Sequence, residues 1–201
     1  MSHSNDNASP LLIQHLELFK CLPTSQAVLD LACGYGRNGI FLLNNNVPVI
    51  FADNSRSALD AIAEKLKDFD QDLESGEAEF KRADSKRAEY WEVDLERGEQ
   101  DPLAGRTFAG VMVFNYLHRP LMEAIKKAII PGGLIIYETF TEEQSQFGRP
   151  SNPDYLLKPK ELEYSFRDWD ILHSSEGHKQ NPERAVASIV ARKSSNDSRI
   201  D

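Results

Sequence analysis

The chain has 201 residues, of which 40% are hydrophobic and 27% are charged, so its length and composition suit one globular domain with a full core. The formal net charge is −9 and no cluster of lysine and arginine offsets it locally, which argues against nucleic acid as a partner. No apolar run approaches the ~20 residues of a membrane span and the N-terminus lacks a secretory pattern, so we expect a cytoplasmic protein with no membrane partner.

We expect one folded domain over residues 10–193 between two flexible tails, 1–9 and 194–201, because the tails are rich in serine, asparagine and aspartate. Two cysteines and five scattered histidines show no zinc-like spacing, so the sequence predicts no metal site.

Apolar runs alternate with amphipathic stretches along this domain. A Ser-Pro start signal predicts a short helix over 9–20. Strands are then predicted over 27–32, 47–53, 90–94, 110–115 and 133–138, and helices over 36–44, 55–69, 119–130 and 159–166. The strand runs lack clean alternation, which is typical of parallel strands buried on both faces. The sequence therefore predicts a doubly wound α/β sheet.

Two further strands are predicted near the C-terminus, over 168–175 and 185–193. The polar stretch between them is too short for a crossover helix, so this pair should be antiparallel. The highly charged segment 70–89 is predicted to be a solvated surface region.

The stretch from Val28 to Leu43, "VLDLACGYGRNGIFLL", contains the glycine spacing of a dinucleotide fingerprint, but Asp30 precedes the first glycine. Ligands of open α/β sheets bind at the carboxyl ends of the strands. The residues expected there are mostly acidic: Asp30, Asp53, Asp94, Asn115 and Glu138. Because a pyrophosphate is negative and seeks backbone N–H donors, nearby carboxylates disfavour it and favour a cationic ligand.

S-adenosylmethionine is such a ligand, with an ammonium, a sulfonium and a ribose diol. Asp30 is suited to its amino-acid end, directly or through water, while Asp53 can accept from both ribose hydroxyls and Asp94 from the adenine amino group. Gly34 and Gly36 would then let the backbone approach the nucleoside. Arg37, in the first turn of the following helix, is a candidate for the ligand carboxylate.

The same stretch resembles motif I of the class I S-adenosylmethionine-dependent methyltransferases, and its "GRN" resembles the tellurite-resistance-type branch. "FADNS" resembles the acidic end of their second strand, "EVDLE" their adenine-contacting loop and "PGGLIIYETF" the turn into their fifth strand. The resemblance covers about residues 26–193. It implies a Rossmann-like, seven-stranded, mostly parallel sheet with an antiparallel C-terminal strand pair and helices on both faces. The cofactor-binding residues that it implies are Asp30, Ala32, Gly34, Gly36, Arg37, Asp53, Asn54, Asp94, Leu95 and Asn115.

Several positions allow a second interpretation. Ala32 stands where most members have glycine, which is acceptable if its backbone stays in the β region. In the second interpretation, Asp53 only caps the next helix and Asp94 only forms a turn. Cys33, near a helix N-terminus, is a candidate reactive thiol, although in this motif cysteine is usually a small packing residue.

Methyl transfer is an in-line displacement in which the protein mainly aligns the acceptor with the methyl group. His118 is a candidate general base, and Tyr137 or Glu138 could orient an acceptor. The long segment 140–158 is a candidate lid, with Arg119, Phe147, Arg149 and Tyr155 as acceptor or lid residues. The two arginines favour a small anionic acceptor, and the tellurite-resistance resemblance makes a thiol or chalcogen acceptor a further candidate.

Other functions remain open at this point. A nicotinamide-dependent oxidoreductase would share the glycine spacing, but the chain has no Tyr-x-x-x-Lys pair and no room for a separate catalytic domain. Aminopropyl transfer from decarboxylated S-adenosylmethionine would use the same site. A non-catalytic sensor or accessory subunit would need only the cofactor contacts.

Overall fold

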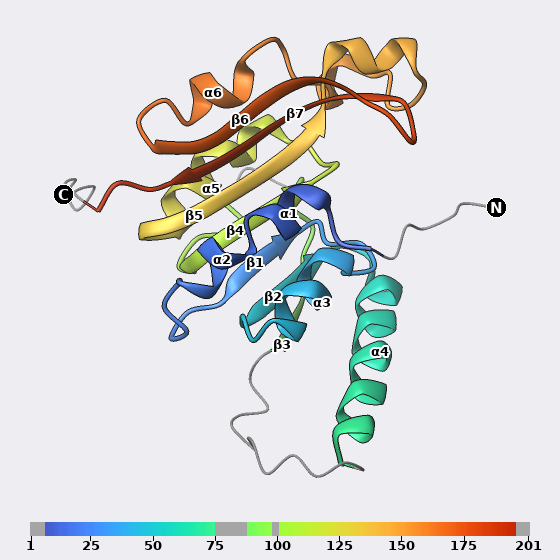
Figure 1. Cartoon of the computed structure of the whole chain (residues 1–201), viewed down its shortest axis with the longest axis vertical. Helices are drawn as coiled ribbons and strands as arrows, with labels where there is room; N and C mark the ends of the chain where they lie inside the picture. The colour runs from blue at the N-terminus through green and yellow to red at the C-terminus, as the bar shows by residue number, and fades with distance from the viewer. Residues whose placement is uncertain (1–6, 75–87, 98–100, 196–201) are drawn as a thin grey trace. The chain divides into compact units, whose positions relative to one another are not determined.

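Seven strands form one mixed sheet in the order β3-β2-β1-β4-β5-β7-β6 (Figure 1). The computed structural model describes residues 7–74, 88–97 and 101–195. The chain divides into two compact units, Met1–Leu95 and Glu96–Asp201, which are taken in turn.

The first unit contains three parallel strands and their helices. Its elements are α1 (Pro10–Gln14), α2 (Leu16–Lys20), β1 (Val28–Leu31), α3 (Arg37–Asn44), β2 (Val49–Asp53), α4 (Arg56–Glu74) and β3 (Ala88–Glu92). Both β1 and β3 pair in parallel with β2. The single helix predicted over 9–20 is wrong in one respect, because the backbone of His15 leaves the helical region (φ −107°, ψ 13°) and separates α1 from α2.

Burial in this unit follows position in the sheet. Every residue of β1 is buried, and so are the first four of β2. The edge strand β3 is half-buried or exposed throughout, so the expectation of burial on both faces is wrong for that strand. Strand β3 also ends two residues before the predicted boundary, and Asp94 lies in the loop that follows.

The helix α3 packs closely on β2 because two glycines leave room for it. A Cβ at Gly36 would come within 2.6 Å of Ile62 Cδ1. A Cβ at Gly39 would overlap the ring of Phe51 and come within 2.8 Å of Asp30 Oδ2. Gly36 was predicted to let the backbone approach a ligand. It also has a packing role, which the glycine spacing alone did not indicate.

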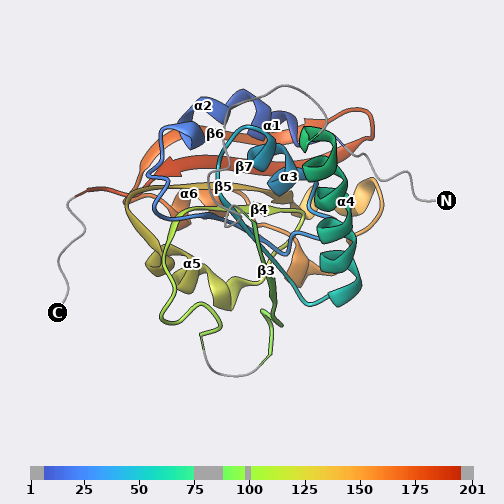
Figure 2. The same ribbon diagram turned by 90° about the horizontal axis from the view of Figure 1, so that it is seen from below.

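The second unit contains the remaining four strands. Its elements are β4 (Phe108–Phe114), η1 (Arg119–Leu121), α5 (Met122–Ala128), β5 (Ile129–Phe140), η2 (Glu142–Gln146), η3 (Pro153–Tyr155), α6 (Glu161–Ser165), β6 (Asp170–Lys179) and β7 (Arg184–Arg192). Strands β4 and β5 are parallel, whereas β7 is antiparallel to both β5 and β6. Helix α5 lies against β5 (Figure 2) and α6 against β7.

The predicted doubly wound, mostly parallel sheet with an antiparallel C-terminal pair is confirmed. The predicted flexible N-terminal tail, residues 1–9, is wrong for its last two residues. Ala8 and Ser9 are buried, and the Ser9 amide donates to Asn38 Oδ1 at 2.8 Å. Residues 1–6 and 196–201 of the tails, and 75–87 of the charged segment, lie outside the described residues. No helix in the described ranges is long and apolar enough to cross a membrane.

Gly39→Ala should destabilise the protein, because the new methyl group would overlap Phe51 and crowd Asp30. Overpacking of this kind costs about 1–3 kcal/mol, which exceeds the gain of about 1 kcal/mol that alanine brings inside a helix. Urea unfolding measures the difference. Asn44→Ala, at the exposed end of the same helix, is the control and should stay within about 0.5 kcal/mol of wild type. A Gly39→Ala protein as stable as wild type would contradict this packing.

Candidate functional site

The loop between β1 and α3 turns sharply through left-handed backbone conformations. Ala32, Gly34 and Gly36 have φ values of 54°, 54° and 71°. The Cys33 amide donates to the carbonyl of Ala52 at 3.0 Å, which ties the loop to β2. The condition that Ala32 stay in the β region is therefore not met, and this non-glycine residue carries a backbone strain of about 1–2 kcal/mol.

Asp53 joins the ends of β1 and β2 through its carboxylate. Oδ2 accepts from the Gly34 amide at 2.7 Å, and Oδ1 accepts from the Ser55 amide at 2.9 Å. The helix cap itself is Ser55, whose Oγ accepts from the Ala58 amide at 3.3 Å. Capping of α4 is thus not the main role of Asp53, and its half-buried carboxylate retains lone pairs for a ligand hydroxyl.

Asp30 is buried beneath the same loop, and its Oδ2 accepts from the Gly39 amide at 2.8 Å. Burial raises the pKa of this carboxyl to about 7, although the Gly39 hydrogen bond and the charge of Arg37 both favour the ionised form; the charge of Asp53 raises the pKa further. The observed contact of Asp30 is with the first turn of α3, so its contact with a ligand amino group stays a prediction.

The other residues predicted around the loop lie on either side of it. Arg37 Nη1 donates to the carbonyl of Asn7 at 3.3 Å, so the N-terminal segment lies beside this guanidinium. Asn54 and Asp94 are exposed, whereas Leu95 is buried. The amide of Val93 donates to the Asp53 carbonyl at 3.0 Å, which brings the loop carrying Asp94 next to Asp53.

Cys33 is a packing residue in this loop. Burial and the nearby charges of Asp30 and Asp53 raise the pKa of its thiol, which opposes formation of a thiolate. Its Sγ donates to the Gly34 carbonyl at 3.6 Å. The alternative of a reactive thiol is therefore not supported.

In the second unit, Asn115 follows β4 in a left-handed conformation with φ 55°, and its amide donates to the Glu138 carbonyl at 2.9 Å. His118 precedes η1, and its side chain does not cap that helix. Tyr137 is buried, and its hydroxyl donates to the Tyr116 carbonyl at 3.0 Å. Burial raises the pKa of Tyr137 well above its ordinary value, so this hydroxyl serves the fold and is not placed to orient an acceptor.

Arg119 does not have a free guanidinium for an acceptor. Its Nε and Nη2 donate to the two carboxylate oxygens of Glu161 at 2.7 and 2.9 Å. Its remaining contacts are with the carbonyls of Asp154 and Leu156, at 2.9 and 2.7 Å. The predicted acceptor role of Arg119 is therefore corrected, because its guanidinium links the turn after β4 to the segment after β5. No local pattern indicates this contact, since Glu161 is 42 residues away in the chain.

The candidate lid, residues 140–158, is a loop held by hydrogen bonds to neighbouring segments. Gln144 is buried, with Oε1 accepting from the Ala185 amide at 2.9 Å and Nε2 donating to the Arg149 carbonyl at 3.2 Å. Phe147 meets the ring of His178 edge-on, with centroids 5.0 Å apart. The side chains of Arg149 and Tyr155 are exposed. Both ends of this segment are hydrogen-bonded to neighbouring elements. Its motion as a lid stays a prediction.

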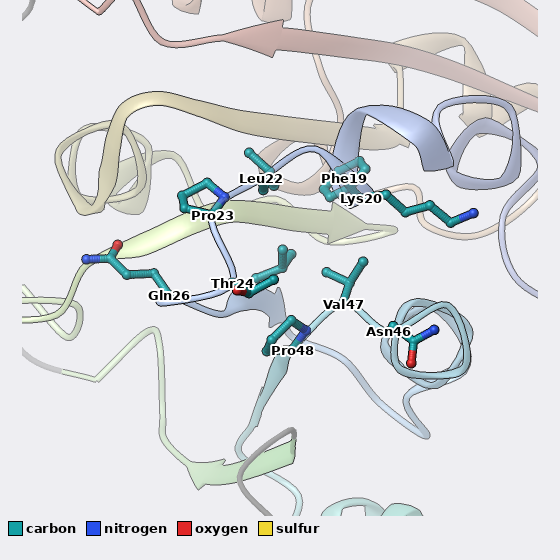
Figure 3. A pocket seen from close by; sticks show the side chains of 10 residues that line it. Phe19, Lys20, Leu22, Pro23, Thr24, Gln26, Asn46, Val47 and Pro48 are labelled. Atoms are coloured by element: carbon teal, nitrogen blue, oxygen red, sulfur yellow. The ribbon is translucent and has the colours of Figure 1, made fainter. Parts of the chain in front are cut away.

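The first unit also contains a small hollow (Figure 3). It is lined by the segment before β1 and the turn before β2, including Phe19, Pro23, Gln26 and Pro48. These positions are at the amino ends of the strands, whereas Asp30, Asp53 and the glycine loop are at the carboxyl ends. Among the described residues, no group of three or more histidine, cysteine or acidic side chains is placed to hold a metal.

Residues 2–90 match the family model of the methyltransferase small domain. A search of curated proteins found no match. Among solved structures, TehB from Haemophilus influenzae is similar at 17% identity and a TM-score of 0.67, over 90% of this chain and 61% of TehB. The chain therefore spans less than two thirds of the length of that protein.

Two further neighbours agree. A magnesium protoporphyrin IX methyltransferase from Synechocystis PCC 6803, solved with bound SAH, is 15% identical with a TM-score of 0.64, over 92% of this chain and 80% of its own. An S-adenosylmethionine-dependent methyltransferase from Methanosarcina mazei is 11% identical with a TM-score of 0.62, over 94% and 99%. The likenesses to these three solved structures show the fold.

Asp30→Asn should stabilise the protein increasingly as the pH rises from about 4 to 7. The carboxyl has a folded-state pKa of about 7, above its ordinary value of 3.8, so the folded protein holds a proton that the unfolded chain has lost. Stability contributed by this proton disappears as the pH rises, at about 1.4 kcal/mol per pH unit. Asparagine stays neutral and can still accept from Gly39. Urea unfolding of both proteins across this pH range measures the difference, and a pH-independent difference would contradict it.

Proposed function

We propose that this protein is an S-adenosylmethionine-dependent methyltransferase that acts on a small acceptor and releases S-adenosylhomocysteine. The carrying observation is that two carboxylates, Asp30 and Asp53, hydrogen-bond the backbone of one glycine loop. The match of residues 2–90 to a methyltransferase model, which includes this loop, supports the same conclusion.

The charge around the loop favours this cofactor over a dinucleotide. A pyrophosphate would need amide donors of this loop, yet the Gly34 amide already donates to Asp53 and the Gly39 amide to Asp30. Two carboxylates would also repel it. A ligand with a sulfonium and an ammonium meets attraction instead, so a nicotinamide-dependent oxidoreductase is the weaker proposal.

The residues present suit S-adenosylmethionine in the first unit. Asp53 is assigned to the ribose hydroxyls, and the loop carrying Asp94 and Leu95 to the adenine. Arg37 and Asp30 are assigned to the amino-acid end. Apart from Gly34 itself and its two chain neighbours, no heavy atom of the described residues lies within 4 Å of the position that a Cβ at Gly34 would occupy, so the backbone there is open to a ligand. Asn54 and Ala32 are assigned as backbone neighbours of the cofactor.

The bound cofactor would supply a methyl group activated by a positive sulfur, so the chain's own residues need only align and deprotonate the acceptor. A cation beside Asp30 favours its ionised form, so binding near neutral pH should release a proton from this carboxyl. His118 is proposed as the general base for an acceptor that arrives protonated.

The class of acceptor is proposed more narrowly from sequence resemblance and charge. The "GRN" element of the glycine loop makes a thiol or chalcogen acceptor one candidate. An anionic small molecule is the other. A sensor that binds the cofactor without turnover would share the loop but would form no S-adenosylhomocysteine with any acceptor, so mass spectrometry of that product distinguishes the two functions.

Asp53→Asn should weaken S-adenosylmethionine binding by at least about tenfold, because the substitution removes the charge and one of two acceptor oxygens. Isothermal titration measures the change. Asp60→Asn is the matched control, since Asp60 is an exposed aspartate on α4 that pairs with Arg56 at 3.0 Å. Unchanged affinity in Asp53→Asn, with a correctly folded protein by circular dichroism, would contradict the assigned role.

A further inference from the structure

A cluster of charged side chains in the second unit has no part in the cofactor site described above. It consists of Glu138 on β5, Lys179 on β6 and Arg184 on β7. Lys179 is paired directly with Arg184, and Glu138 with Ser188, in the antiparallel ladders. Side chains of directly paired residues, and of alternate residues along a strand, share one face of a sheet. The three charges therefore meet on the same face.

Glu138 sits at the centre of this cluster. Its side chain is only 3% exposed, and its Oε2 is bonded to Lys179 Nζ. Its Oε1 lies 3.7 Å from Nη2 of Arg184. One carboxylate thus faces two cations, which leaves the cluster with a single net positive charge.

The guanidinium of Arg184 is incompletely bonded. Its Nε is buried and has no hydrogen-bond partner in the part of the chain that the structure describes. The distance of 3.7 Å to Glu138 is an ion-pair contact and is too long for a hydrogen bond. Buried N–H groups are normally satisfied, and the planar fork of an arginine matches the two oxygens of a carboxylate.

The cluster can be reached from solvent through its cations. The side chains of Lys179 and Arg184 are 33% and 24% exposed, while Glu138 beneath them is covered. Glu138 is two residues from the carboxyl end of β5, and Lys179 and Arg184 are the residues that flank the turn between β6 and β7. Gln144 fastens the segment after β5 to the amide of Ala185, the neighbour of Arg184. Ligands of open α/β sheets bind at such strand ends.

We propose that Lys179 and Arg184 bind the carboxylate of a small carboxylic acid, and that Glu138 positions both cations. This site goes beyond the proposed methyl transfer and does not depend on it. A monoanion would neutralise the single net charge, whereas a phosphate dianion would leave an excess negative charge beside buried Glu138. Glu138 neutralises one of the two cations, so one positive charge is left for an anionic ligand.

The test follows the side-chain Nε–H signal of Arg184 by nitrogen-proton NMR while sodium acetate is added at constant ionic strength. We expect a saturable shift with a dissociation constant of about 1 to 10 mM. Sodium phosphate should bind more weakly. Lys179→Gln should weaken acetate binding by at least about fivefold, because the second cation is lost.

Arg192→Gln is the matched control, because Arg192 lies on the same strand and its Nη1 donates to the Gly132 carbonyl at 3.1 Å. It should leave acetate binding at Arg184 unchanged. No saturable shift of the wild-type signal, equal binding of phosphate, or an unaffected Lys179→Gln protein would each overturn the carboxylate site.

Titration of the same samples with S-adenosylhomocysteine separates this inference from the proposed function. If S-adenosylhomocysteine binds and acetate does not, the carboxylate site is wrong and the methyltransferase proposal stands. If acetate binds and S-adenosylhomocysteine does not, the carboxylate site stands and the methyltransferase proposal is overturned.

Discussion

Two aspartates at the ends of adjacent parallel strands accept hydrogen bonds from the loop that leads into α3. Asp53 holds Gly34 at the start of the loop, and Asp30 holds Gly39 in the first turn of the helix. These bonds fix a backbone that passes through three left-handed residues, one of which is alanine. The geometry of the loop, the close approach of α3 to β2 and the charge offered to a ligand all depend on this pair.

The pair also links stability to function. Asp30 has a carboxyl pKa of about 7, so this carboxyl can be neutral near physiological pH. The fold tolerates its burial for that reason. A cationic ligand would favour its ionised form, so a feature that weakens the free protein at higher pH would strengthen ligand binding there. Strain and unfavourable burial of this kind are often concentrated at functional sites.

Much of the fold could be predicted from the sequence, because buried parallel strands have a strong local signal. The runs that became β1 and β2 are apolar and end at polar residues, and the short polar connection before β7 required an antiparallel pair. Strand β3 was misplaced by two residues because an edge strand is largely exposed and so has little apolar pattern. The break at His15 had no local signal, since no glycine or proline marks it.

The candidate site was less predictable, because roles of side chains depend on contacts between distant parts of the chain. The sequence indicated Asp30 and Asp53, since each lies at the carboxyl end of an apolar strand. It could not show that the Arg119 guanidinium would be paired with Glu161, or that the Tyr137 side chain would be buried. The pairing of Lys179 and Arg184 around Glu138 depends on the register of three strands, which lies beyond any local pattern.

The central claim is that this acid-lined glycine loop selects a cationic nucleoside over a dinucleotide. Isothermal titration of the wild-type protein with S-adenosylmethionine and with NADH at pH near 8 tests it most directly. The account predicts micromolar binding of S-adenosylmethionine and no measurable binding of NADH. Tight binding of NADH, with none of S-adenosylmethionine, would contradict it.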